Sequence, residues 1–295
     1  MDAKKILLIL FLPIIATAKS DVTFDNSPNE YAKSRLVSEG FSKSFVNLIV
    51  DKIDDDERDK VVQLNVLGFL YTADYSKHYS KDAIRKCRAF LKKYKLYLKS
   101  AERLHGVPKE LIAALLWVET KHGKRLGSFH VPSVFFYLLQ ADHPHIVQKT
   151  IEATEGKLSA SEDTDQVKSK IIARSKAKAN WALSELRSLS KIHSEKSKDL
   201  SELRGSYAGA FGLPQFIPSS YLQWARPRTK RRYPNLFFVN DAIHSVAFYL
   251  KFNGWKKGNQ ASQREALFHY NRSQGYVDII MKLASELGFT PKKSL

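Results

Sequence analysis

Glu119 is the residue whose type and position most clearly suggest chemistry. The segment before it is apolar, and Glu119 shares a helical stripe with Ile112, Leu115 and Leu116, which precede it by seven, four and three residues. Burial on such a face disfavours a carboxylate anion, and the partial negative charge at the C-terminal end of a helix disfavours it further. Both effects raise the pKa, and a carboxylic acid that keeps its proton near neutral pH can protonate a glycosidic oxygen.

A structural role for Glu119 is the alternative. A buried glutamate can pair with a neighbouring cation, and Lys121 and Arg125 follow it closely in the sequence. Trp117, two residues before it, is expected to be a core side chain rather than a platform for a sugar. The helix alone leaves both interpretations of Glu119 open.

A second candidate segment, residues 205–221, mixes small, hydrogen-bonding and aromatic residues. Its glycines allow close approach of the backbone to a ligand. Ser206 and Gln215 can bond hydroxyl and acetamide groups, and the aromatic rings can cover sugar faces. A tight structural turn is the alternative reading of the same residues.

Helices are expected to position these groups. The spacing of apolar residues predicts one long helix over 81–105, which Gly106 and Pro108 end. The next helix is expected to run to about His122 and to stop at Gly123. No convincing strand is found outside the turns.

Several polar residues are expected to begin other helices. The acidic run 54–57 can cap a following helix, and it lacks the alternating ligands and the glycine of a calcium loop. Ser219 or Ser220 is expected to cap a short helix, and Asn240 or Asp241 to cap the next one. Residues 152–204 are read as a charged, partly exposed helical insertion, with a flexible linker as the alternative.

The N-terminus has the pattern of a secretory signal peptide. Lys4 and Lys5 precede an apolar run over residues 6–15, and Ala16-Thr17-Ala18 provides a cleavage site, so residues 1–18 are expected to be removed. A short buried helix or an uncleaved anchor is the alternative. The protein is therefore expected to be exported, periplasmic or secreted, without a transmembrane segment after cleavage.

Composition and charge limit the class of protein. Hydrophobic residues make up 43% of the chain, which argues for a sizeable core. The one cysteine, Cys87, cannot form an internal disulfide and is expected to be buried in a helix. The net charge of +18, with five cations in residues 226–232, favours polyanions. In an exported protein these are acidic envelope polymers, and nucleic acid is not expected.

At this point the chain resembles a known family, the lytic transglycosylases of the membrane-bound B type, glycoside hydrolase family 103. The resemblance covers roughly residues 80–285. The matching stretches are His105-Gly106-Val107-Pro108, Val118-Glu119-Thr120 with Gly123, residues 205–221, Asp241-Ala242-Ile243, Gly254-Trp255, and Tyr270-Asn271 with Tyr276.

The resemblance implies a mainly α, lysozyme-like catalytic domain over residues 81–295, after a helical N-terminal region over 19–80. It implies a monomer that cleaves peptidoglycan glycan strands. Glu119 matches the family's catalytic acid/base. The positions that match residues lining the sugar site are Ser206, Gln215, Tyr270, Asn271 and Tyr276.

The resemblance also implies a mechanism with one carboxylate. Ordinary glycosidases use two, and no second acid lies beside Glu119 or in the segment from Ser206 to Tyr221. In the family the acetamide of N-acetylmuramic acid assists, and the product has a 1,6-anhydro end. No metal or organic cofactor is required.

The charge of one segment departs from the family pattern. Residues 226–232 are basic where the family often has an acidic, calcium-loop-like segment, so no calcium is expected there. His143-Pro144-His145 is expected to be a loop rather than a metal site. The rivals are a hydrolytic muramidase on the same fold, selective for de-N-acetylated glycan, and a non-catalytic basic protein that binds envelope polymers or nucleic acid.

Overall fold

The computed structural model describes residues 27–155, 163–195, 199–228 and 232–290, and their regular structure is almost entirely helical, which confirms the predicted mainly α class. The predicted signal peptide, residues 1–18, lies outside the described residues, as do residues 229–231 of the basic run. No helix within the described ranges is both long enough and apolar enough to cross a bilayer.

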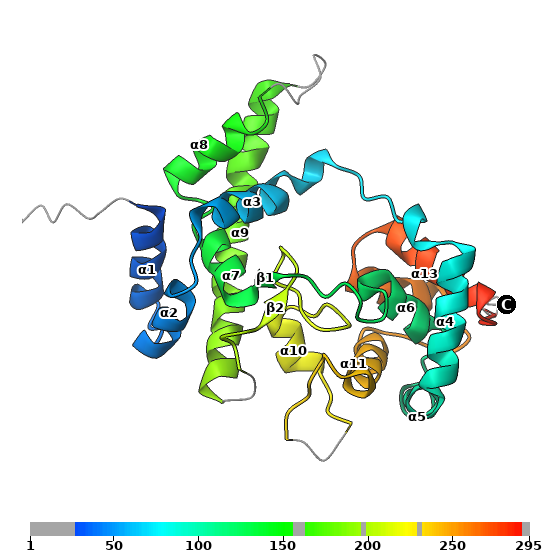
Figure 1. Cartoon of the computed structure of the whole chain (residues 1–295). Helices are drawn as coiled ribbons and strands as arrows, with labels where there is room; N and C mark the ends of the chain where they lie inside the picture. Colours follow the sequence, from blue (N-terminus) through cyan, green and yellow to red (C-terminus); the bar gives the residue numbers. More distant parts are fainter. Residues whose placement is uncertain (1–26, 156–162, 196–198, 229–231, 291–295) are drawn as a thin grey trace, which may run out of the picture.

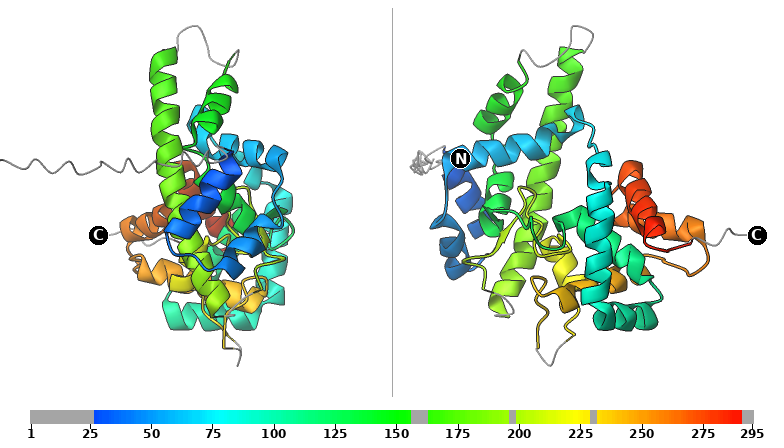
Figure 2. Two further views of the ribbon diagram at one scale, coloured as in Figure 1. Left: turned by 90° about the vertical axis from the view of Figure 1, so that its left-hand side faces the viewer. Right: turned by 45° about the vertical axis from the view of Figure 1, so that its right-hand side comes forward.

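The helices form two groups that lie on opposite sides of the molecule (Figures 1 and 2). The first group contains α1 (Pro28–Ser38), α2 (Lys43–Val50), α3 (Asp55–Val66), α7 (Val131–Leu139), α8 (Pro144–Glu152) and α9 (Thr164–Ser194). The second group contains α4 (Lys81–Lys93), α5 (Lys95–His105), α6 (Lys109–Thr120), α11 (Val239–Phe252), α12 (Gln260–Tyr270) and α13 (Gln274–Glu286). Helix α10 (Pro218–Trp224) contacts α9 in one group and α11 in the other.

Short irregular elements connect the two groups. Two 3-10 turns, η1 (Leu67–Leu70) and η2 (Ser76–His78), lie on the first crossing between them. The second crossing leads from α6 to the two-residue strand β1 (Phe129–His130), which pairs antiparallel with β2 (Arg204–Gly205). A Cβ on Gly127 would lie 2.1 Å from the carbonyl oxygen of Gly205, so only glycine fits there.

Helix α6 is the centre of the second group. Every residue from Leu111 to Val118 is buried, because α4, α5 and α13 pack around the helix. Such all-round burial is what an apolar segment of this length predicts. The helix ends at Thr120 because Lys121 and His122 adopt positive φ angles of 52° and 58°.

The prediction of one helix over 81–105 is wrong. The backbone turns at Tyr94, where φ is −107° and ψ is 25°, and Figure 1 shows α5 nearly end-on below α4. Helix α4 packs on α6, whereas α5 packs on both α6 and α11. The bend lets one continuous apolar pattern cover two different partners. Cys87 lies buried in α4, as predicted, and burial raises the pKa of its thiol to about 12.

The predicted helix caps had mixed outcomes. Asp54 caps α3, accepting hydrogen bonds from the backbone N–H groups of Asp56 and Glu57. The prediction of Ser219 or Ser220 as a cap is wrong, because α10 starts at Pro218 and Ser219 donates to the Glu185 carboxylate.

The prediction of Asn240 or Asp241 as a cap is also wrong, since Phe238 occupies the cap position of α11. The Asp241 carboxylate instead accepts hydrogen bonds from backbone N–H groups of the preceding connection. In both places a tertiary partner takes the polar side chain that local rules assign to a cap.

The segment 152–204 contains α9, whose 31 residues form a continuous helix rather than a flexible linker. Leu186, Leu189 and Ile192 are fully buried, and the helix packs along α7 and α10. Its other face carries exposed lysines, as the charged composition predicted. Helix α9 is therefore part of the core of the first group.

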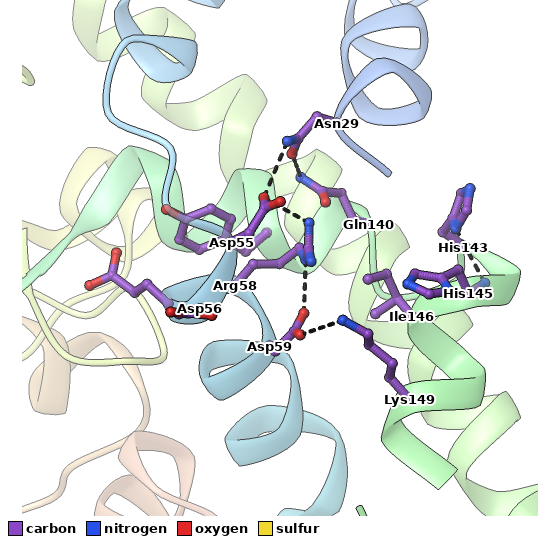
Figure 3. A network of polar contacts seen from close by, with 12 residues as sticks. Asn29, Asp55, Asp56, Arg58, Asp59, Gln140, His143, His145, Ile146 and Lys149 are labelled. Carbon is purple, nitrogen blue, oxygen red and sulfur yellow. Dashed lines mark hydrogen bonds and ion pairs between the residues drawn. The ribbon is translucent and has the colours of Figure 1, made fainter. Parts of the chain in front are cut away.

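The acidic run at the start of α3 belongs to a network that joins helices (Figure 3). Arg58 donates to Asp55 and to Asp59, both at 2.9 Å, and Lys149 of α8 donates to Asp59 at 3.1 Å. Asn29 of α1 donates to Asp55 at 3.3 Å. The carboxylates of Asp55 and Asp59 are therefore paired with cationic side chains of the chain itself.

Replacing Asp241 with alanine is expected to destabilise the fold by about 2–6 kcal/mol. Asp241 is fully buried and accepts from the backbone N–H groups of Arg228 at 2.9 Å and Asn235 at 2.8 Å. Without the carboxylate these donors lack an acceptor, which costs about 1–3 kcal/mol for each. Urea unfolding measures the loss. The exposed Asp51→Ala is the control, with an expected change within about 0.5 kcal/mol, and equal costs in the two variants would contradict this role.

Candidate active site

Glu119 lies in the last turn of α6 with its side chain partly buried. The hydroxyl of Tyr276 donates a hydrogen bond to its Oε1 atom. Burial raises the pKa of Glu119 to about 7, although the Tyr276 hydrogen bond acts in the opposite direction. A carboxyl group with this pKa is substantially protonated at neutral pH and can both give and take a proton.

The structure does not support the alternative of a buried ion pair. Among the described residues, no cation forms a salt bridge with Glu119. The Lys121 Nζ atom lies 2.6 Å from His78 Nδ1 and 4.6 Å from the centre of the Trp117 ring. The left-handed turn at Lys121 and His122 carries the lysine to another side of α6. Trp117 is a core residue, as predicted, and is 7% exposed.

Tyr270 and Tyr276 form a wall beside Glu119. Tyr276 lies in the first turn of α13, which Ser273 caps, and Tyr270 ends α12. Their rings are nearly parallel, with centres 6.4 Å apart. The Tyr270 hydroxyl donates to the carbonyl oxygen of Pro214 at 2.5 Å. This hydrogen bond ties the tyrosine wall to the segment 205–221.

The segment 205–221 is also fixed to the end of the Glu119 helix. The Thr120 hydroxyl donates to the carbonyl oxygen of Leu213 at 3.0 Å. Gln215 has a positive φ of 51°, and its Nε2 atom donates to the carbonyl oxygens of Gly212 at 2.9 Å and Leu126 at 3.3 Å. The predicted site segment and the predicted acid therefore lie side by side.

Ser206 and Asn271 have other partners. The Ser206 hydroxyl accepts from the backbone N–H groups of Ala208 at 3.3 Å and Ala210 at 3.2 Å, within its own turn. Asn271 is exposed, and its Nδ2 atom donates to the Tyr75 hydroxyl at 3.3 Å. The structure thus brings Glu119, Tyr270 and Tyr276 together. Asn271 is linked to this group through Tyr75, which contacts both Asn271 and Tyr276.

Tyr75 also lies beside the tyrosine wall, although nothing in the sequence singled it out. It lies on the crossing between the two groups, just before η2, and its ring centre is 5.8 Å from that of Tyr276 in an edge-on arrangement. The segment has no helical or strand period that would single it out. Its place beside Asn271 and Tyr276 extends the aromatic wall.

The described residues contain no group of three His, Cys, Asp or Glu side chains that could hold a metal ion. The sequence predicted a loop at His143, but this residue caps α8. Its ring accepts a hydrogen bond from the backbone N–H of His145 at 3.3 Å. Its ring also packs edge-on against Tyr31. His143 therefore has structural roles, as the cap of α8 and as a packing partner of Tyr31.

Glu119→Gln is expected to be more stable than the parent protein at pH 8 but not at pH 4.5. The folded pKa is about 7 and the ordinary value is 4.5, so between these values the folded state holds a proton that the unfolded state releases. Stability therefore falls as the pH rises through this window, and glutamine removes that loss. We expect the Tm advantage of the variant to exceed about 2 °C at pH 8. A difference independent of pH would show that burial does not penalise the anion.

Both a family model and a curated relative match the sequence of this chain. The family described as "Transglycosylase SLT domain" matches residues 23–266. Membrane-bound lytic murein transglycosylase B of Escherichia coli (strain K12) is 28% identical over 186 residues, which are 63% of this chain and 42% of that protein. The match thus spans less than half of the length of this curated relative.

Solved structures share the fold at low sequence identity. The Escherichia coli lytic transglycosylase Slt35 in complex with bulgecin A has a TM-score of 0.66 and 20% identity, over 89% of this chain and 93% of that one. SltB1 from Pseudomonas aeruginosa, a soluble lytic transglycosylase, has a TM-score of 0.62 and 21% identity, over 88% and 97%. SltB3 from Pseudomonas aeruginosa, in complex with NAG-NAM-pentapeptide, has a TM-score of 0.64 and 15% identity, over 90% and 81%. These similarities confirm the expected fold.

Proposed function

Since the chain belongs to the transglycosylase SLT domain family, we propose that it cleaves the β-1,4 bond between N-acetylmuramic acid and N-acetylglucosamine in peptidoglycan glycan strands. The observation that carries the proposal is Glu119, a partly buried carboxyl group with a pKa of about 7 beside an aromatic wall. A protonated carboxyl at such a site supplies the proton that a departing sugar oxygen needs.

The proposed reaction uses Glu119 twice. Its carboxyl proton passes to the glycosidic oxygen as the bond to C1 breaks, and the acetamide of the muramic residue stabilises C1. The Glu119 carboxylate then takes the proton of the muramic 6-hydroxyl while that oxygen bonds to C1. A 1,6-anhydro end results, and no water is consumed.

Among the described residues, no second carboxylate contributes to the electrostatics of Glu119, and this supports the proposed route over hydrolysis with two acids. In the described part of the chain, burial and the Tyr276 hydroxyl account for the pKa of Glu119, and no other acid contributes. A retaining glycosidase needs a second carboxyl group about 5 Å from the first. We assign Tyr75, Tyr270, Asn271 and Tyr276 to one wall of the sugar site and Ser206 and Gln215 to the facing segment.

The proposed substrate also places the protein outside the cytoplasm. Peptidoglycan lies in the cell envelope, and the N-terminal pattern ending at Ala18 is that of an export signal. The relative in Escherichia coli is named as membrane-bound. We propose export, with cleavage after Ala18.

Digestion of purified peptidoglycan tests the function directly. The reaction is run in water enriched in heavy oxygen, and the soluble products are analysed by mass spectrometry. We expect fragments with anhydro ends, each lighter by one water than its hydrolytic counterpart and free of heavy oxygen. A parallel digestion uses glycan lacking the muramic N-acetyl group, which we expect to resist cleavage because the assisting acetamide is missing.

The outcomes separate the rival functions. Heavy oxygen at new reducing ends would identify a hydrolytic muramidase. Cleavage of the de-N-acetylated glycan at the same rate would show that the acetamide does not assist. The release of no fragments from either glycan would leave a non-catalytic binding protein.

A further inference from the structure

A hollow with a volume of about 220 Å³ lies between α4 and the end of α6, and four of the residues that line it are lysines. The lysines are Lys86, Lys93, Lys121 and Lys124, and we call this site the lysine hollow. Trp117 also lines it. Residues 117 and 119 are about 200° apart around a helix, so the lysine hollow lies on the other side of α6 from the Glu119 carboxyl.

The positive charge of the lysine hollow is poorly compensated. Lys86 pairs with Asp82 at 2.5 Å, but Lys93, Lys121 and Lys124 form no ion pair with any described residue. No carboxylate lines the hollow. Burial, together with a smaller contribution from the nearby Arg125, lowers the pKa of Lys121 to about 8. An anion in the hollow would relieve this crowding of like charges.

Packed aromatic and imidazole rings line the hollow beside the lysines. Phe90 and His122 stack with ring centres 4.0 Å apart, and the Trp117 Nε1 atom donates to the carbonyl oxygen of His78 at 3.0 Å. Phe90 and Trp117 are 5% and 7% exposed. Packed rings exclude water from one side of the lysines, and attraction between charges is stronger where the local dielectric constant is low.

We propose that the lysine hollow binds a phosphate group carried by a larger ligand, a phosphate-bearing polymer or a lipid headgroup. Lysine ammonium groups are compact point charges that bind phosphate oxygens, and four lysines line this one hollow. The volume admits one phosphate with its neighbouring group, not a length of polymer. Such a site would hold the protein at a phosphate-bearing surface without occupying the site at Glu119.

Calorimetric titration tests the proposal with inorganic phosphate and with N-acetylglucosamine 1-phosphate as probes. Acetate and chloride at equal ionic strength are the reference anions. The double variant Lys93→Gln/Lys124→Gln removes two exposed members of the hollow. Each lost charged hydrogen bond weakens binding by about tenfold or more.

The matched control is Lys168→Gln/Lys176→Gln, which changes the same charge at exposed positions of α9. We expect it to bind phosphate within about twofold of the parent protein. Equal loss in both double variants would show attraction to the overall charge and overturn the site. Phosphate binding no tighter than acetate binding would overturn it as well. No glycan is cleaved in these measurements, so they are independent of the proposed function.

A second pair of measurements identifies the carrier of the phosphate. The protein is mixed with vesicles containing phosphatidylglycerol and, separately, with a soluble glycerol-phosphate polymer. Binding to either ligand that the Lys93→Gln/Lys124→Gln change weakens supports the proposal and names the source. Binding to neither, with free phosphate bound, would overturn the inference of a larger ligand.

Discussion

Replacing Glu119 with glutamine is expected to slow glycan cleavage by about 10²–10⁴-fold, the usual contribution of a positioned acid or base. The loss should lie near the upper limit, because the proposed reaction uses the same carboxyl group for both proton transfers. Glutamine keeps the shape and can still accept the Tyr276 hydrogen bond, so the wall should stay in place. Initial rates of fragment release from peptidoglycan measure the effect.

The matched control lies on the same helix. Glu110 is in the first turn of α6 and pairs with Lys109 at 2.6 Å, so Glu110→Gln makes the same chemical change far from the tyrosine wall. We expect it to retain cleavage within about twofold of the parent protein. If Glu119→Gln cleaves as fast as Glu110→Gln, the central role of Glu119 is wrong.

The sequence identified Glu119 because its signal is local. An apolar helix that ends in an acid predicts both a buried helix and a raised pKa, and the structure has both. The ion-pair alternative depended on where Lys121 points. That direction follows from two consecutive residues with positive φ, and non-glycine residues rarely adopt such angles, so no local rule predicts it.

The errors at helix boundaries have a common physical origin. The break at Tyr94, between α4 and α5, does not interrupt the apolar spacing. It is set by packing, because α4 packs on α6 whereas α5 packs mainly on α11. Ser219 and Asp241 are good capping residues by type, but buried partners compete for them. The tertiary hydrogen bonds prevail because an unpaired buried polar group costs more free energy than a missing exposed cap.

The parts of the site that could not be predicted depend on long-range contacts. Tyr75 contacts Asn271 although 196 positions separate them in the sequence. In the first group, Arg35 of α1 binds Asp142 at 3.2 Å and Asn180 of α9 at 2.8 Å. Helical periodicity shows which face is buried, but not which segment covers it. The sequence indicated the tyrosine wall only through a family resemblance, and the contact between Tyr276 and Glu119 is seen only in the structure.

Replacing Tyr276 with phenylalanine is expected to move the alkaline limb of the pH profile to higher pH. The Tyr276 hydroxyl donates to Glu119 and thereby favours the anion, so its loss should raise the pKa of Glu119 further above about 7. The first step needs the protonated acid, and the alkaline limb of kcat/KM reports its deprotonation in the free enzyme. The kcat/KM for soluble glycan strands, measured between pH 5 and 9, gives the shift.

Tyr270→Phe provides the control for that shift. The Tyr270 hydroxyl donates to the Pro214 carbonyl rather than to Glu119, so its loss removes a wall contact without removing a donor to the acid. We expect lower kcat/KM with the alkaline limb in its original place. A limb that stays fixed in Tyr276→Phe, or moves to lower pH, would mean that the acid of the first step is not the carboxyl group that Tyr276 contacts.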